Sequence, residues 1–343
     1  MKNKLLSSVI LFILLSIISC EKNNPDKEVL PKQLTSTNLD SKCFWSPKGD
    51  HVAFLSARNS YDPNASIVIF ELWIMDKDGS NQRPLILVDE LYEKTNVVNV
   101  SWSMNSDAML AQIYTPEGSE IWKVTIDGIK TRLSSSDQWA ERPEYSPDGS
   151  KVAFIIQGPN PPQGSPVYRL YSANPDFSDT ILIEKGLIGD YDWIHGSEGF
   201  VYSLYDRTNE NFDLWKSNID GTEKQRISET PEDEEILSCS YDGNYISYSD
   251  YNAVFITPSD IFSSSLLMDS ARSPRWIPNR NLILLYSHQS QDDSFWTESW
   301  IVDIHGGVIT KIAEGENSEV AFSLSGDYFS YTLEGNIWLD KLP

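Results

Sequence analysis

One motif recurs along most of the chain and constrains its fold more than any other feature. An aromatic residue is followed by a turn and then by a short apolar segment, as in "FWSPKGDHVAFLS" and "EYSPDGSKVAFII". The aligned position in the seven copies is held by Trp45, Trp102, Tyr145, Trp193, Cys239, Trp276 and Phe322. The intervals are 57, 43, 48, 46, 37 and 46 residues, and a period near 40–50 residues with several short strands per unit is typical of β-propeller blades.

Each unit contains the same four predicted strands. The order Ser-Pro-x-Gly at 46–49 and 146–149 suits a tight turn after the first strand, because Pro presets φ and Gly accepts a positive φ. An Asp-Gly turn ends the third strand, as in "ELWIMDKDG" (71–79), and the fourth carries Arg or Lys before an apolar residue, as in "TRLS" (131–134). No later segment has a sustained helical period. The sequence therefore predicts an all-β, seven-bladed β-propeller of four-stranded antiparallel blades over residues 29–343.

The two ends of the repeat support the count of seven. The last unit supplies only three strands, over 319–323, 328–333 and 336–342. A segment that suits the missing fourth strand, "PKQLTST" (31–37), precedes the first unit. An N-terminal strand in the last blade would close the ring and remove an exposed sheet edge.

The repeat resembles a known family at this point. The pattern W-S-P-D-G-x-x-I-A-F-x-S, followed by an I-Y-x-x-D-x-D-G turn, resembles the WD40-like repeat of TolB-type propellers, and "FWSPKGDHVAFLSARN" (44–59) and "PEYSPDGSKVAFI" (143–155) match it closely. The resemblance spans 29–343 and implies a protein-binding or scaffolding module of the cell envelope. TolB itself carries an α/β domain before a propeller usually of six blades, and residues 29–343 leave no room for that domain.

The N-terminus has the pattern of an export signal. Lys2 and Lys4 precede an apolar stretch at 5–18, which is shorter than the roughly 20 residues that span a bilayer. The run Ile-Ile-Ser before Cys20 resembles the lipobox of bacterial lipoprotein signals. That resemblance implies a signal peptide over 1–19, lipidation of Cys20, a polar tether over 20–28 and an exported protein anchored to the cell envelope, with the outer membrane as the expected site. A plain signal peptide or an uncleaved anchor is the alternative.

The charge of the chain limits its partners. The net charge is −23, and removal of Lys2 and Lys4 with the signal peptide would lower it to −25. A body this acidic repels phosphate backbones, so we expect no nucleic-acid partner and no membrane contact beyond the lipid. The remaining cysteines, Cys43 and Cys239, fall in units three apart around the predicted ring. A disulfide requires Cα atoms within about 7 Å, so we expect two free, buried thiols.

Candidate binding residues fall on one predicted face. The connections between second and third strands, and between successive units, reach that face, and they include the long segments 56–66, 86–98, 157–166, 228–237 and 287–298. Loops longer than the connection requires are where such scaffolds usually carry function. The candidates for contact with another cell-envelope protein are Arg58, Tyr61, Trp139, Arg142, Tyr205, Arg207, Phe295 and Trp296. We interpret the seven aligned positions instead as packing between blades, and the acidic run at 232–235 as a solvated loop.

The sequence offers no catalytic signature. The motifs G-x-S-x-G, H-E-x-x-H and C-x-x-C are absent, and we expect no catalytic residue, metal or cofactor. The alternative function is a metal-dependent lyase or another enzyme that acts on an acidic oligosaccharide in the channel. Some oligogalacturonate lyases resemble TolB-type propellers and bind a divalent metal through histidines and a glutamine. His288 and Gln289 would match, whereas His51, His195 and His305 fall at the opposite end of the predicted blades.

Overall fold

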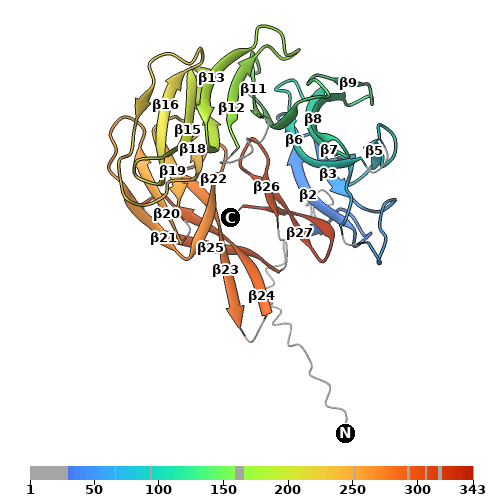
Figure 1. The fold of residues 1–343 in the computed structure, drawn as a ribbon. Coiled ribbons are helices and arrows are strands. Elements are labelled where there is room, and N and C mark those ends of the chain that lie inside the picture. The colour runs from blue at the N-terminus through green and yellow to red at the C-terminus, as the bar shows by residue number, and fades with distance from the viewer. Residues whose placement is uncertain are drawn as a thin grey trace, which may run out of the picture.

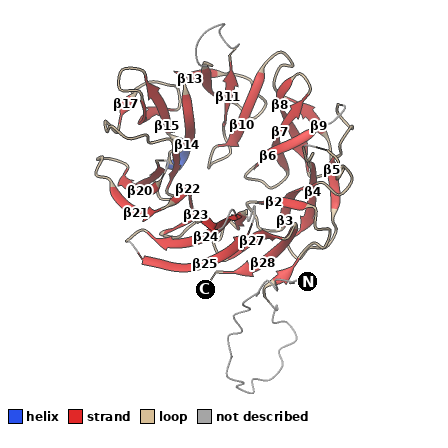
Figure 2. Ribbon diagram, turned by 60° about the horizontal axis from the view of Figure 1, so that its bottom comes forward, coloured by secondary structure: helices blue, strands red, loops and turns tan. Residues whose placement is uncertain are grey.

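Seven four-stranded sheets surround a central axis within the part of the chain that the structure describes (Figures 1 and 2). The structure is a computed structural model that describes residues 30–342 except 66, 93–94, 159–165, 251, 292–293, 306 and 316–318. The expected signal peptide, the tether and Cys20 lie outside these residues. Over the described range, no helix has the length and apolar character to cross a membrane. The predicted all-β, seven-bladed propeller is confirmed.

In the first four blades the strands follow chain order from the innermost to the outermost. Blade 1 contains β2 (Asp40–Trp45), β3 (His51–Ser56), β4 (Glu71–Asp76) and β5 (Arg83–Ile86), and blade 2 contains β6 (Asn96–Trp102), β7 (Ala108–Thr115), β8 (Gly118–Thr125) and β9 (Lys130–Arg132). Blade 3 contains β10 (Trp139–Tyr145), β11 (Val152–Gln157), β12 (Tyr168–Ala173) and β13 (Ile181–Gly186), and blade 4 contains β14 (Ile188–Trp193), β15 (Gly199–Asp206), β16 (Asn211–Asn218) and β17 (Gln225–Arg226).

The last three blades complete the ring. Blade 5 contains β18 (Ile236–Cys239), β19 (Tyr245–Ser249), β20 (Ala253–Pro258) and β21 (Ser265–Asp269), and blade 6 contains β22 (Ala271–Trp276), β23 (Leu282–Gln291), β24 (Ser294–Asp303) and β25 (Gly307–Gly315). Blade 7 contains β26 (Val320–Phe322), β27 (Tyr328–Leu333), β28 (Asn336–Lys341) and the N-terminal β1 (Lys32–Gln33). One short 3₁₀ helix, η1 (His195–Ser197), lies in the first turn of blade 4.

The predicted closure of the ring by an N-terminal strand is present. β1 pairs antiparallel with β28, with Lys32 opposite Leu339. Beyond β1, the amide of Leu34 donates to the carbonyl oxygen of Ile337 at 2.8 Å. The Leu34 side chain is buried in a cluster with Cys43, which belongs to blade 1. The N-terminal segment therefore covers the edge of blade 7 and also packs on the first blade.

Tight turns with glycine at a positive φ connect strands at one end of the blades. Gly49 and Gly149 have φ values of 70° and 72°, and each donates its amide to the carbonyl of the serine three residues earlier at 2.8 Å. These turns confirm the Ser-Pro-x-Gly prediction, because a residue with a Cβ is disfavoured at such φ. The turns after the first and third strands together form one end of the propeller, which we call the short-turn face. The opposite end is the long-loop face.

Two sequence-based expectations are wrong in detail. The segment 287–298 is not an irregular loop, because β23 and β24 pair continuously up to Gln291 and Ser294. The hairpin projects beyond the body of the propeller (Figure 1). Cys43 and Cys239 are free, as predicted, but only Cys43 is buried. Cys239 is partly exposed, as are Trp45 and Phe322 at the same position of their units.

Candidate functional site

The long-loop face carries large apolar side chains that solvent reaches. Within the described residues the exposed members of this group on this face are Tyr61, Ile67, Val68, Tyr114, Trp139 and Leu333. Two of them lie together: the rings of Tyr114 and Trp139 have centroids 6.2 Å apart and planes inclined at 52°. The pair joins the end of β7 to the start of β10, so it lies between blades 2 and 3.

A cavity of about 660 Å³ adjoins this aromatic pair. Its lining includes Glu117, Gln138, Trp139 and Arg169. The indole nitrogen of Trp139 donates to a carboxylate oxygen of Glu141 two residues later, which fixes the ring at the edge of the cavity. A half-exposed aromatic ring beside an arginine and a carboxylate gives this edge both apolar and charged contact groups.

Arg142 lies on the same inner strand as Trp139, and its side chain reaches the innermost strand of the next blade. The ladder between β10 and β11 shifts register between Glu141 and Glu144, and Arg142 has a φ of 51°. Such a bulge redirects a side chain. One guanidinium nitrogen then donates to the Gly189 carbonyl at 2.7 Å and to Asp190 at 3.0 Å, so Arg142 bridges blades 3 and 4 while half of its side chain stays exposed.

Arg58 differs, because its guanidinium is held by its own blade. It donates to Asp40 at 2.8 Å and to Gln82 at 3.1 Å. Its guanidinium carbon lies 4.2 Å from the ring centroid of Trp73. The Asp40 side chain is fully buried and that of Arg58 is 16% exposed. These contacts make Arg58 part of the packing of blade 1 and leave little of it for a partner.

The other predicted residues lie on three blades. Tyr61 is 54% exposed in the β3–β4 connection, and Arg207 is exposed in the β15–β16 turn. Tyr205, half-buried at the end of β15, has its ring 5.3 Å from that of Phe212. Phe295 and Trp296 belong to β24, but their side chains lie outside the described part of the structure, as do those of His288 and Gln289.

An acidic cluster on the inner strands was missed by sequence reasoning. Glu144 of β10 and the pair Asp190 and Asp192 of β14 lie near one another, with Arg275 of β22 close enough to act on Glu144. Asp192 accepts hydrogen bonds from the amides of Trp193 and Cys239, both at 2.7 Å. The innermost strand of each blade is a sheet edge, so some of its backbone amides have no partner in the sheet. The Asp192 side chain of blade 4 accepts from one such amide, that of Cys239 in blade 5.

The environment raises the pKa of each of these carboxyl groups. Burial, followed by the charges of Asp192 and Asp190, raises the pKa of Glu144 well above its usual range, against the opposing effect of Arg275. Burial raises the pKa of Asp192 to about 6, although backbone hydrogen bonds partly oppose it. Burial also raises the pKa of Asp190, with Arg142 as the chief opposing group. Like charges held close together resist simultaneous ionisation, so these carboxyl groups lose their protons at a higher pH than isolated ones do.

A signal for this cluster existed in the sequence. Glu144 and Asp192 each precede the aligned position of their unit, as do Ser101 and Arg275 in theirs. Since side chains alternate along a strand, the residue before a packing residue points to the opposite side. In the structure these residues hold equivalent register positions on the inner strands of their blades. Their mutual proximity depends on blade geometry that the spacing alone does not give.

Metal-ligating residues do not converge within the described structure. His51, His195 and His305 lie at the short-turn face, as predicted, in or beside turns of three different blades. Across the residues described, no three His, Cys, Asp or Glu side chains are placed to hold a metal ion. In the acidic run 232–235, Glu234 is buried and accepts a hydrogen bond from Ser228 at 2.6 Å, so it stabilises the loop from within.

Comparison with known proteins places this geometry among propellers. No family model and no curated protein matches the sequence. An oligogalacturonate lyase in complex with manganese is similar in structure, with a TM-score of 0.69 at 13% identity over 91% of this chain and 92% of that chain. TolB from Acinetobacter baumannii has a TM-score of 0.53 at 14% identity, over 81% and 64% of the two chains. A TolB-like protein from Agrobacterium tumefaciens gives 0.54 at 16%, over 77% and 94%. The likeness is one of fold. It agrees with the TolB-type propeller that the repeat predicts.

Proposed function

We propose that the propeller is a protein-binding module that docks a cell-envelope partner on its long-loop face. The observation that carries this proposal is the exposed pair Tyr114 and Trp139, which lies beside a large cavity and near Arg142 on the same face. Tyr, Trp and Arg are the residues most enriched at the energetic centres of protein interfaces. The half-exposed rings lose little side-chain freedom when a partner covers them.

Two further features support docking at this position. Trp139 is oriented by its hydrogen bond to Glu141, and Arg142 by its contacts with blade 4, so both are held before a partner arrives. Preorganisation of this kind reduces the entropy lost on association. Tyr61, Tyr205, Arg207, Phe295 and Trp296 stay predictions for the wider rim, and Arg58 is the weakest of the eight candidates because its own blade engages it.

The location of the module is part of the proposal. A lipid on Cys20 would hold the propeller at the cell envelope, with the outer membrane as the expected site, and the tether at 20–28 would let it turn toward a partner. The support is the lipobox-like sequence alone. Mass spectrometry of the N-terminal peptide, compared with a Cys20→Ser variant, tests it: an unmodified Cys20 in membrane fractions would contradict lipid anchoring.

Matched substitutions on the two faces test the docking proposal. Tyr114→Ala and Trp139→Ala are expected to weaken partner capture from envelope extracts at least tenfold. Tyr241→Ala is the control, since Tyr241 is as exposed as Tyr114, at 39%, but lies in a first-strand turn of the short-turn face. Equal capture by all variants would contradict docking on the long-loop face.

A second candidate is a metal-dependent lyase acting on an acidic oligosaccharide. It is favoured by the superposition with the manganese-bound oligogalacturonate lyase over nine-tenths of both chains. The side chains described do not provide the ligands, so the candidate depends on His288 and Gln289. Calorimetric titration with manganese alone tests it. Stoichiometric binding that His288→Ala abolishes would favour the lyase, and no binding would reject it.

A further inference from the structure

Six of the seven aligned positions fill the space between adjacent blades with an aromatic ring. Indole nitrogens fix three of these rings to the preceding blade. Trp102 donates to the carbonyl of Phe44 at 2.9 Å, Trp276 to the carbonyl of Ser238 at 3.1 Å, and Trp45 to the hydroxyl of Ser330 at 3.0 Å. The aromatic residue is therefore a repeated interblade plug with a defined orientation.

The interface between blades 4 and 5 lacks this plug. Cys239 occupies the aligned position in blade 5, where it pairs with Ile246 as Trp193 pairs with Phe200 in blade 4. The residue that would contact the plug from the preceding blade is also missing. At the next interface Trp276 stacks on Tyr245, with centroids 6.2 Å apart, and the residue of blade 4 that corresponds to Tyr245 is Gly199.

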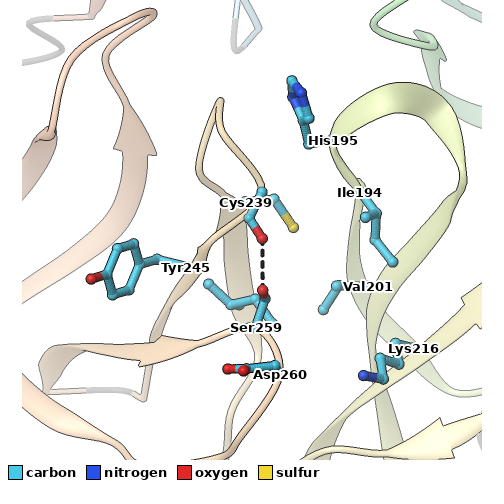
Figure 3. Close-up of a pocket in the computed structure, with 10 residues that line it drawn as sticks. Ile194, His195, Val201, Lys216, Cys239, Tyr245, Ser259 and Asp260 are labelled. Atoms are coloured by element: carbon cyan, nitrogen blue, oxygen red, sulfur yellow. Dashed lines mark hydrogen bonds between the residues drawn. The ribbon is translucent and has the colours of Figure 1, made fainter.

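A pocket lies beside Cys239, between blades 4 and 5. Its volume is about 240 Å³, and its lining includes Ile194 and Val201 from blade 4 and Cys239 and Ile246 from blade 5. Figure 3 shows the Cys239 thiol pointing across the pocket toward Ile194 and Val201, while the Tyr245 ring points away. Lys216 and Asp260 lie at the margin. The interior is apolar and charged groups are kept to its edge.

Rigid elements hold the pocket open. Gly243 turns with a φ of 75°, and a Cβ there would lie 2.7 Å from the Cβ of His195, so the first turns of the two blades are in close contact above the pocket. The Ser259 hydroxyl donates to the Gly243 carbonyl at 2.6 Å and ties the third-strand turn to the first (Figure 3). The walls come from paired strands and from turns bonded to each other, so the space does not need to be opened by a ligand.

We propose that this pocket binds a small planar aromatic molecule of about the size of indole, in the position that an aromatic side chain fills at the other interfaces. An apolar cavity of about 150 Å³ is sufficient to bind benzene, and this one is larger. The backbone carbonyl of Asp192 holds the position in blade 4 that those of Phe44 and Ser238 hold in blades 1 and 5. At those two positions the carbonyls accept the indole hydrogen bonds of Trp102 and Trp276. The ligand would bind without covalent chemistry, because indole carries no electrophilic centre for the Cys239 thiol to attack.

Indole and a plug-restoring variant test the proposal. Isothermal titration of the full chain with indole is expected to give saturable binding at one site and a rise in melting temperature. Cys239→Trp is expected to melt higher than the wild type without ligand and to bind indole at least tenfold more weakly. Cys239→Ala, which enlarges the pocket, is the matched control and is expected to keep binding. No saturable binding to the wild type, or equal binding by Cys239→Trp, would overturn the proposal.

Thiol labelling gives a second readout that needs no variant. Methyl methanethiosulfonate is expected to label Cys239 faster than Cys43, which is 7% exposed, when the peptides are read separately by mass spectrometry. Saturating indole is expected to slow labelling at Cys239 and to leave Cys43 unchanged. Labelling of Cys239 at the same rate with and without indole would overturn the proposed position of the ligand. The pocket opens at the short-turn face, so these results are independent of docking on the long-loop face.

Discussion

Replacement of Asp192 by asparagine is expected to change how the stability of the propeller depends on pH. The pKa of Asp192 is about 6 in the folded protein, against an ordinary value of 3.8. Between these values the folded state holds a proton that the unfolded state has lost. Unfolding therefore releases a proton in this window, and the free energy of unfolding falls as the pH rises.

The magnitude follows from the shift. A difference of about two pKa units corresponds to about 3 kcal/mol, which the wild type loses between about pH 4 and pH 6 and which Asp192→Asn does not lose. The amide keeps one acceptor oxygen for the two backbone amides that Asp192 now satisfies, so the variant also pays a constant penalty of about 1–3 kcal/mol. The pH dependence of the difference, and not its absolute value, is therefore the informative quantity.

Urea unfolding followed by tryptophan fluorescence from pH 4 to pH 8 measures this difference. The unfolding free energy of the variant, taken relative to that of the wild type, is expected to rise by about 3 kcal/mol as the pH rises. No further change is expected above pH 7. Parallel curves would refute the inference that the pKa of Asp192 is raised in the folded protein.

Asp148→Asn is the control with the opposite sign. Burial tends to raise the pKa of Asp148, but hydrogen bonds from Ser146 and Ser150 outweigh it and lower the pKa. Its contribution to stability is present above the ordinary pKa and is lost as the pH falls through the lowered value. Asp148→Asn is therefore expected to be destabilised relative to the wild type by a constant amount above about pH 4. The difference is expected to shrink only below the ordinary pKa of 3.8, so the urea curves of this variant are extended into that acid range.

Two other pairs of substitutions give further tests of stability. Arg58→Met is expected to lower the unfolding free energy by about 3 kcal/mol, because it leaves the buried Asp40 carboxylate without its cation. Arg142→Met removes an exposed ion pair and is expected to lower it by no more than about 1 kcal/mol. Urea midpoints measure both, and equal losses would contradict these assignments. Gly335→Ala is expected to cost more than about 1 kcal/mol, since its φ is 69° and an added Cβ would lie 2.3 Å from a backbone oxygen. Gly307→Ala, with nothing within 4 Å of the added Cβ, should stay within about 0.5 kcal/mol of the wild type, and thermal melts compare the two.

The ring was predictable because its signals are local and repeated. The turn at 46–49 and the aromatic residue before it specify a hairpin without reference to the rest of the chain, and seven such hairpins leave few other architectures. The closure by β1 followed from counting strands. The hairpin of β23 and β24 was misjudged, because a run of polar residues such as "SHQSQ" (287–291) looks like a loop in sequence even where it forms a strand.

The acidic cluster could not be predicted from the sequence to the same degree. Glu144 and Asp192 are nearly fifty residues apart, and their proximity depends on the angle between blades and on the bulges in β10 and β14. The partial exposure of Cys239 has a similar origin. The missing aromatic residue was visible in the alignment of the repeats, but the pocket beside it also depends on Ile194 and Val201 in the neighbouring blade.

Site-specific photo-crosslinking tests the proposed docking on the long-loop face most directly. A benzophenone amino acid placed at Tyr114 or at Tyr241 samples opposite faces with equal exposure, 39% in each case. Irradiation in the native envelope is expected to give a discrete crosslinked partner from position 114 and none from position 241, and Trp139→Ala should reduce the yield at position 114. The same partner captured from position 241 alone, or equally from both positions, would contradict the proposed binding face.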